Sequence, residues 1–272
     1  MPRDDASLIA PPRAYGEAHV AAGLRGGHSH LAGLRQSGSA KVLLPRASDD
    51  DGLTAILLNT AGGITGGDAF AYRGEARAGT RLTLSTQAAE RAYRAQPGET
   101  GSMNVALKAD EGARIDWLPQ ETILFDGSSL ARRLEVDLAS DARFLAVEAV
   151  LLGRAAMGER LSDFAFTDNW RVRRGGALIY ADAVRLSRDA MAGPATLSGA
   201  GAFASILLAC PAAERHLAAL RDGLGPAGGA SVIRPGVLAA RILCADGFAL
   251  RQVLIPAIEA LRGAPLPKAW RL

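Results

Sequence analysis

The chain has 272 residues, 49% of them apolar and 22% charged, which is the composition of a folded globular protein and excludes a disordered chain. The net charge is only +3, and its basic residues are interspersed with acidic ones, which disfavours nucleic-acid binding. Two distant cysteines exclude a disulfide framework, and no apolar run approaches the ~20 residues that span a membrane, so a reducing cytoplasm is the expected location.

The first 30 residues are predicted to be a loosely ordered lead-in. They are rich in Ala, Gly and Pro and show no clear hydrophobic period. His28 and His30 are two positions apart, so both imidazoles would lie on one side of an extended strand, an adequate geometry for a metal pair. Because they fall in this glycine-rich segment, they are a weak signal for metal binding.

The stretch AILLNTAGGITGGDAFAYR, residues 55–73, joins two strand-like runs through two glycine pairs. A phosphate-binding loop needs a closing Lys and Ser/Thr and then a helix, whereas here Asp68 and an alternating segment follow. The glycines therefore predict a turn or bulge where the backbone needs freedom. Asp68 is predicted either to cap this turn through its side chain or to be a functional carboxylate.

From Lys41 onward the hydrophobic period is mostly two, which predicts at least eight short strands separated by turn signals. Strands joined by tight turns are expected to pair antiparallel. The predicted fold is therefore mainly β, with antiparallel β meanders forming stacked sheets. The clearest alternating stretches are RLTLSTQ (81–87), NVALKA (104–109), RRLEVDL (132–138), RFLAVEAVLL (143–152), FAFTDNWRVRR (164–174) and ALIYADAVRL (177–186).

The C-terminal third mixes strands with two predicted α-helices. AFASILLACP (202–211) and GVLAARILCAD (236–246) are predicted strands. Leucines between 217 and 224 and apolar residues between 250 and 261 have helical spacing, and Asp246 can cap the start of the second helix. These helices could pack on the sheet or dock on a partner. No linker divides the chain, so residues 1–272 are predicted to form a single domain.

Two carboxylates stand within apolar stretches, Glu148 in AVEAVLL and Glu121 in LPQETILFDG. A carboxylate that faces a core needs a partner, so each is expected either to pair with an arginine or to line a water-filled path. Such a path would bind divalent cations weakly through oxygen atoms. A different function also fits these residue types: a β-sandwich hydrolase in which Glu121 and Asp126 do acid/base chemistry, if a turn brings them together.

Several long segments resemble the UreD family of urease accessory proteins, called UreH in some organisms. The resemblance runs from about Leu34 to the closing PLPKAWRL, while the residues before it lack this support. The segments that carry it are LLNTAGGITGGD (57–68), LSTQAAERAYRA (84–95), LPQETILFDGSSLARRLEVDL (118–138), ARFLAVEAVLLGRAAMGE (142–159) and WRVRRGGALIYAD (170–182).

The resemblance implies a non-enzymatic scaffold, or metallochaperone, in the maturation of urease, whose active site holds nickel. Family members join UreF and the GTPase UreG on the urease apoprotein, which contains UreC, and UreE supplies the nickel in many systems. Two copies are expected in the assembled complex, through dimeric UreF. The implied fold, a single UreD-like domain, is mainly β with two helices.

The resemblance also implies an internal passage for Ni²⁺ lined by polar and acidic groups, with Ni²⁺ in transit and no tightly bound cofactor. Weak oxygen ligands suit a passage, because the ion must be released at its end. The candidate path or interface residues are the carboxylates within the matched segments: Asp68, Glu121, Asp126, Glu148 and Glu159.

Overall fold

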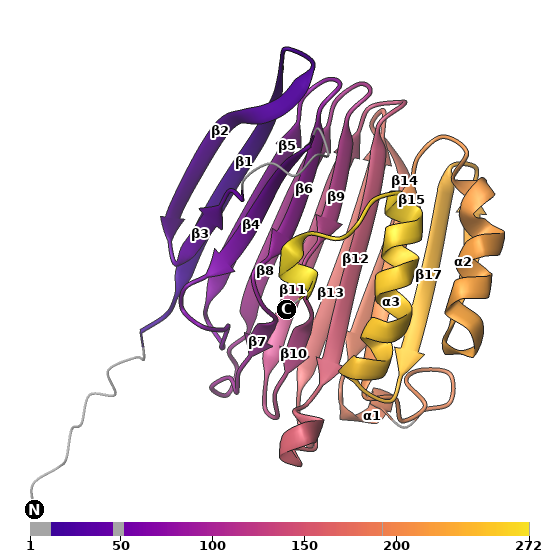
Figure 1. The fold of residues 1–272 in the computed structure, drawn as a ribbon. Coiled ribbons are helices and arrows are strands. Elements are labelled where there is room, and N and C mark those ends of the chain that lie inside the picture. The colour runs from indigo at the N-terminus through magenta and orange to yellow at the C-terminus, as the bar shows by residue number, and fades with distance from the viewer. Residues whose placement is uncertain (1–11, 46–51, 192, 272) are drawn as a thin grey trace, which may run out of the picture.

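Two stacked β-sheets, with helices against one of them, make up the computed structural model, which describes residues 12–45, 52–191 and 193–271 (Figure 1). Among these residues sheet A has seven strands, in the spatial order β14 (Ala177–Leu186), β13 (Ala165–Arg174), β11 (Ser129–Leu138), β8 (Gly101–Ala109), β5 (Ala69–Ala76), β1 (Tyr15–Arg25) and β2 (His28–Gly38).

Sheet B has ten strands within the same described ranges. Eight follow the order β16 (Gly228–Arg234), β17 (Val237–Cys244), β15 (Ala202–Ala209), β12 (Arg143–Leu152), β9 (Arg114–Leu118), β6 (Arg81–Thr86), β4 (Leu53–Asn59) and β3 (Ala40–Leu43). The short strands β10 (Thr122–Leu124) and β7 (Glu90–Ala92) lie off this path, with β10 paired to both β12 and β7. The prediction of a mainly β protein with stacked sheets is confirmed.

Through the middle of the chain, successive long strands alternate between the two sheets. Within sheet A the neighbours β5, β8, β11 and β13 are parallel, and so are β4, β6, β9 and β12 within sheet B. The prediction of antiparallel meanders is therefore wrong for the centre of both sheets. A tight turn here passes the chain to the opposite sheet, so the next strand in the same sheet runs in the same direction. Antiparallel pairs, such as β1 with β2 and β12 with β15, lie toward the edges.

The prediction of a loosely ordered lead-in is also wrong from Tyr15 onward. Strand β1 forms there and pairs parallel with β5 and antiparallel with β2. Its inward positions are occupied by Gly16, Ala18, Val20 and Ala22, all buried. Small side chains make a strand hard to recognise from the hydrophobic pattern of the sequence. The close packing against this strand nevertheless requires them. A Cβ atom on Gly16 would lie 2.7 Å from the ring of Phe70. Residues 1–11 of the predicted lead-in lie outside the described residues.

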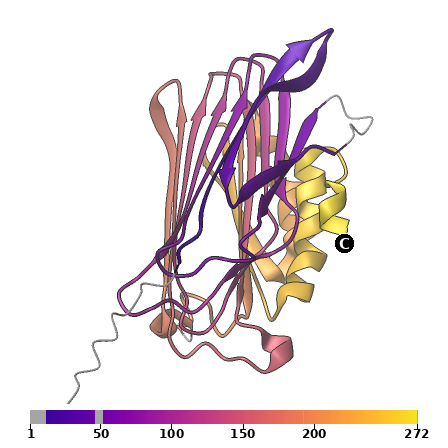
Figure 2. The same ribbon diagram turned by 90° about the vertical axis from the view of Figure 1, so that its left-hand side faces the viewer.

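Helices cover the outer side of sheet B (Figure 2). They are α2 (Leu217–Leu224) and α3 (Gly247–Arg262), which confirms the two predicted C-terminal helices; a single turn, α1 (Arg188–Met191), follows β14. As predicted, the Asp246 carboxylate caps α3 by accepting from the Ala249 N–H at 2.8 Å. Four 3₁₀ segments complete the described elements: η1 (Ala155–Met157), η2 (Ala213–His216), η3 (Gly225–Ala227) and η4 (Lys268–Arg271).

The apolar side chains form two layers. One core fills the space between the sheets and includes Trp117, Phe144 and Trp170. The other lies between sheet B and the apolar faces of α2 and α3, and includes Leu254 and Trp270. Both helices thus pack on the sheet. Cys210 and Cys244 are buried free thiols. In the part of the chain that the structure describes, no helix has the length and apolar character needed to cross a membrane.

Candidate functional site

The strand pairing of sheet B is interrupted beside the middle of β12. Strand β9 pairs with residues 143–146 of β12, and β10 pairs with residues 150–152 on the same side. Residues 147–149 therefore face a loop, 119–121, instead of a strand. The neighbouring chain breaks in the same way, because β6 ends at Thr86 and β7 begins at Glu90. Pro119 suits this break, since proline cannot donate to a strand ladder.

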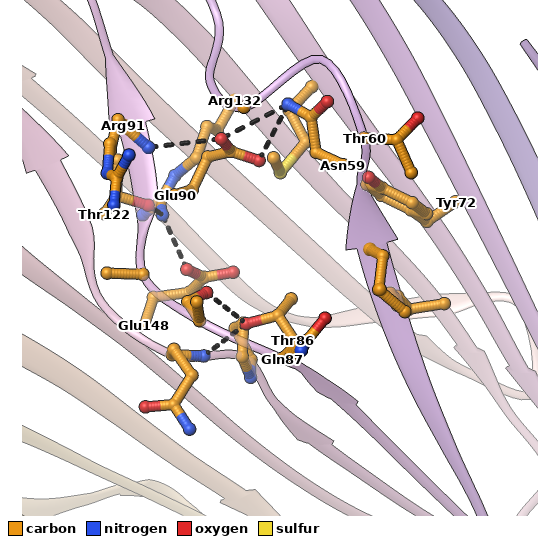
Figure 3. A pocket seen from close by; sticks show the side chains of 18 of the residues that line it. Asn59, Thr60, Tyr72, Thr86, Gln87, Glu90, Arg91, Thr122, Arg132 and Glu148 are labelled. Atoms are coloured by element: carbon orange, nitrogen blue, oxygen red, sulfur yellow. Dashed lines mark hydrogen bonds and ion pairs between the residues drawn. The ribbon is translucent and has the colours of Figure 1, made fainter. Parts of the chain in front are cut away.

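A cavity of about 370 Å³ opens at this interruption and extends between the sheets. Its sheet B side includes Glu148 from β12 and Trp117 from β9, and its sheet A side includes Tyr72, Met103 and Arg132 from β5, β8 and β11. The mouth is lined by the ends of β4 and β6 and by the two loops, with Asn59, Thr60, Gln87, Ala88, Ala89, Glu90, Pro119 and Gln120. Figure 3 shows Glu90, Arg132 and Glu148 together on one side of this space.

A buried ion-pair cluster forms the inner end of the cavity. Arg132 donates from Nη1 to Glu148 Oε2 and from Nη2 to Asp168 Oδ2, each at 2.6 Å. Trp117 Nε1 donates to Glu148 Oε1 at 2.7 Å, and Thr122 Oγ1 accepts from Arg132 at 2.9 Å. Because Arg132 and Asp168 belong to sheet A and Glu148 to sheet B, the cluster joins the two sheets through polar contacts inside an otherwise apolar core.

The charges in this cluster do not balance. Arg132 and Glu148 are each only 5% exposed and Asp168 only 6%, so one guanidinium serves two carboxylates away from water. Burial raises the pKa of the Glu148 carboxyl, because the charged form loses its hydration; the guanidinium of Arg132 opposes this and the carboxylate of Asp168 reinforces it. The cluster therefore has one acidic group more than it has basic groups, and either a proton on Glu148 or a cation in the cavity would neutralise the excess charge.

A second polar group lies nearer the mouth. Asn59 Nδ2 donates to both carboxylate oxygens of Glu90 at 3.3 Å. Burial raises the pKa of the Glu90 carboxyl, while the hydrogen bond from Asn59 lowers it. Burial, together with the charge of Glu90, also raises the pKa of the Tyr72 hydroxyl. Glu90 and Glu148 thus place two carboxyl groups on the wall of one cavity, each in an environment that disfavours an uncompensated negative charge.

The cavity wall presents oxygen atoms of the kind that bind partly hydrated divalent cations. Its oxygen atoms come from two carboxylates and from neutral Asn, Thr and Gln side chains, which are ligands for hard and borderline cations. Among the described residues, no three His, Cys, Asp or Glu side chains are grouped so as to hold a metal ion. His28 and His30 both lie in β2 and belong to no such group.

Of the five carboxylates singled out in the sequence, Glu148 is the one that lines this cavity. Glu121 lies in the loop beside it, where Arg251 of α3 donates to its Oε1 at 2.7 Å. Both of these buried residues therefore have the arginine partner that was one of the two expectations. Asp68 caps its turn: Oδ1 accepts from the Ala14 N–H at 2.7 Å and Oδ2 from the Thr65 N–H at 2.8 Å.

Asp126 and Glu159 are brought together in a separate open hollow, with the Asp126 N–H 3.4 Å from Glu159 Oε1. The N–H groups of Ser162 and Asp163 hold the pKa of Asp126 well below its usual range. Glu159 accepts from Arg154. Glu121 and Asp126, the pair required by the hydrolase alternative, accept from different arginines, Arg251 and Arg94. The open hollow that contains Asp126 is not lined by Glu121.

Sequence reasoning missed Arg132, Asp168 and Glu90 as site residues. A signal was present for the first two. Arg132 alternates with Leu130 and Leu134, and Asp168 with Phe166 and Trp170, so both charges occupy inward positions of predicted strands. Glu90 offers no such pattern, because the three-residue strand β7 is too short to show one.

The chain is similar over almost its whole length to known proteins. A family model described as UreD urease accessory protein matches residues 14–271. Similar relatives, each named "Urease accessory protein UreD", include one from Rhizobium rhizogenes, 50% identical over 272 residues, and one from Roseobacter denitrificans, 48% identical over 270 residues; in both cases the match covers 98% of each chain. One from Sinorhizobium medicae is 46% identical over 276 residues, covering 98% of this chain and 99% of the relative.

Proposed function

The chain belongs to the UreD family of urease accessory proteins, and we propose that it acts in urease maturation as a non-catalytic scaffold that conducts Ni²⁺ through its own interior. Membership of this family assigns the protein to urease maturation. The passage is our proposal. Its main support is the cavity between the two sheets, which opens where sheet B is interrupted and has Glu90 and Glu148 on its wall.

Transfer inside a protein protects the ion from competition. In bulk water, free chelators and proteins would capture a released Ni²⁺, and Cu²⁺ would compete for the same ligands, because affinities generally rise from Mn²⁺ to Cu²⁺. A conduit has to bind the ion weakly enough to release it. Two carboxylates with neutral oxygen donors meet this condition better than a closed cage of thiolates and imidazoles.

The partners follow from the proposed role. The protein would work in a cytoplasmic complex with UreF and the GTPase UreG on the urease apoprotein that contains UreC, with nickel supplied by UreE and with two copies present through dimeric UreF. Nickel is cargo in this scheme, and no tightly bound cofactor is required. Asp126 and Glu159, in their open hollow, are then candidate interface carboxylates, and the capping contacts of Asp68 give it an architectural role in addition.

Reconstitution from purified components tests the function. Urease apoprotein is mixed with the accessory proteins, bicarbonate, GTP and NiCl₂, and urease activity is measured with this protein present, absent, or present with excess EDTA. We expect activation only when the protein and free nickel are both present, and no hydrolytic activity from the protein alone. Full activation without the protein, or hydrolysis by the isolated chain, would overturn the proposal.

A further inference from the structure

The side chain of Arg132 occupies the position that a metal ion would take between two buried carboxylates. Its two terminal nitrogens donate to Glu148 and Asp168 at 2.6 Å each. The carboxylates come from opposite sheets and converge on this one guanidinium. A divalent cation bound there would use the same two carboxylates, so the guanidinium and the ion exclude each other.

Among the described residues that line the cavity, Arg91 is the other basic one. Its side chain is exposed, its backbone N–H donates to Glu90 Oε1, and its charge partly offsets the rise that burial causes in the pKa of Glu90, so it acts on Glu90 and not on the Glu148–Asp168 pair. Arg132 is also incompletely satisfied, since its Nε has no hydrogen-bond partner. A guanidinium is protonated at all physiological pH values, so the cluster always contains this positive charge.

We propose that the guanidinium of Arg132 acts as a counter-ion to Glu148 and Asp168 and thereby keeps the affinity of the cavity for Ni²⁺ low. This inference rests on the proposed nickel passage and adds the residue that sets how tightly the passage holds its cargo. With Arg132 in place, an arriving ion contacts Glu90 first. It can bind Glu148 only by competing with the guanidinium for that carboxylate. Without Arg132, Glu148 and Asp168 become a buried acidic pair that retains the ion.

A purely structural role for Arg132, as a clamp between the sheets, makes a different prediction. Loss of a clamp lowers stability and leaves metal affinity unchanged, whereas loss of a counter-ion raises affinity. Removing one partner of a buried ion pair is strongly destabilising because the other charges remain uncompensated. Metal binding must therefore be measured together with stability, and in a variant from which the carboxylates have also been removed.

The experiment compares the full wild-type chain with Arg132→Met, Arg132→Lys and the triple variant Arg132→Met/Glu148→Gln/Asp168→Asn. Binding of NiCl₂ is measured by equilibrium dialysis, and thermal unfolding is recorded with and without NiCl₂. We expect Arg132→Met to bind one Ni²⁺ at least about tenfold more tightly than wild type, since a nearby like charge is gone. Arg132→Lys, which keeps the charge, should resemble wild type, and the triple variant should lose the added affinity.

If Arg132→Met is unfolded without metal, NiCl₂ should restore its folding transition, because the ion replaces the missing charge. Affinity of Arg132→Met within twofold of wild type overturns the inference, and so does a variant that stays unfolded with NiCl₂. The proposed passage is judged separately, by urease activation with Glu90 and Glu148 changed to glutamine. Blocked activation in that variant with unchanged affinity in Arg132→Met would remove the counter-ion role alone.

Discussion

Changing Glu90 and Glu148 together to glutamine is expected to lower the rate of urease activation at limiting nickel by at least about tenfold, while the protein still assembles with its partners. The two carboxylates supply the negative charge on the cavity wall, and even one factor of ten corresponds to only about 1.4 kcal/mol of lost interaction with the ion. Glutamine keeps the shape of each side chain. At position 90 its carbonyl oxygen can still accept from Asn59; at position 148 it can accept from either Trp117 or Arg132, because these two donate to different oxygens of the Glu148 carboxylate.

The control for this variant changes two glutamates outside the cavity, Glu75→Gln and Glu135→Gln. These side chains are 45% and 43% exposed and lie on β5 and β11 of sheet A. Both double variants lose two negative charges, so a general effect of net charge would slow both. We expect the control to activate urease at the wild-type rate. Normal activation by the cavity variant, measured at limiting nickel, would rule out these two carboxylates as ligands in transit.

Replacing Trp270 by alanine is expected to lower the free energy of unfolding by about 3–5 kcal/mol, as for other large buried aromatic side chains. Trp270 is 2% exposed, packs in the core between sheet B and the helices, and donates from Nε1 to the Leu118 carbonyl at 3.0 Å. Arg251 stacks over its ring with 5.3 Å between the guanidinium carbon and the ring centroid. The substitution leaves a cavity and an unpaired carbonyl at the end of β9.

Phe248→Ala is the matched comparison for Trp270→Ala, because Phe248 is also an aromatic residue near the C-terminus but is 75% exposed. We expect its free energy of unfolding to stay within about 0.5 kcal/mol of wild type. Urea titrations followed by circular dichroism measure both variants. Equal stabilities for the two would mean that the C-terminal segment does not pack on sheet B as described.

The positions of most strands could be predicted because inward-facing apolar residues alternate with outward-facing residues along each strand. Strand β8, for example, buries Met103, Val105 and Leu107 and exposes the residues between them. Strand direction could not be predicted in this way. The same turn signals connect two neighbours in a hairpin or two strands of opposite sheets, and alternation is identical in both cases. Only the packing of the sheets on each other decides which occurs.

Part of the site was readable from the sequence and part was not. Glu148 was found because a carboxylate in an apolar strand is unusual, and its arginine partner was anticipated as a type of residue but not as Arg132. The cavity forms because two neighbouring strands of sheet B are interrupted side by side. One interruption lies between β6 and β7 and the other between β9 and β10, and together they bring residues 87–89 and 119–121 close to each other. That coincidence is a property of the register between chains distant in sequence, and no local pattern encodes it.

Diffraction from crystals of the full chain, soaked in NiCl₂ and measured above and below the nickel absorption edge, tests the passage most directly. We expect anomalous density for nickel inside the cavity between the sheets, within coordination distance of the Glu90 or Glu148 carboxylate. The same crystals of the Glu90→Gln/Glu148→Gln variant should lack that density. Nickel found only on the outer surface, in hollows such as the one that contains Asp126 and Glu159, would contradict transfer of Ni²⁺ through the interior of the protein.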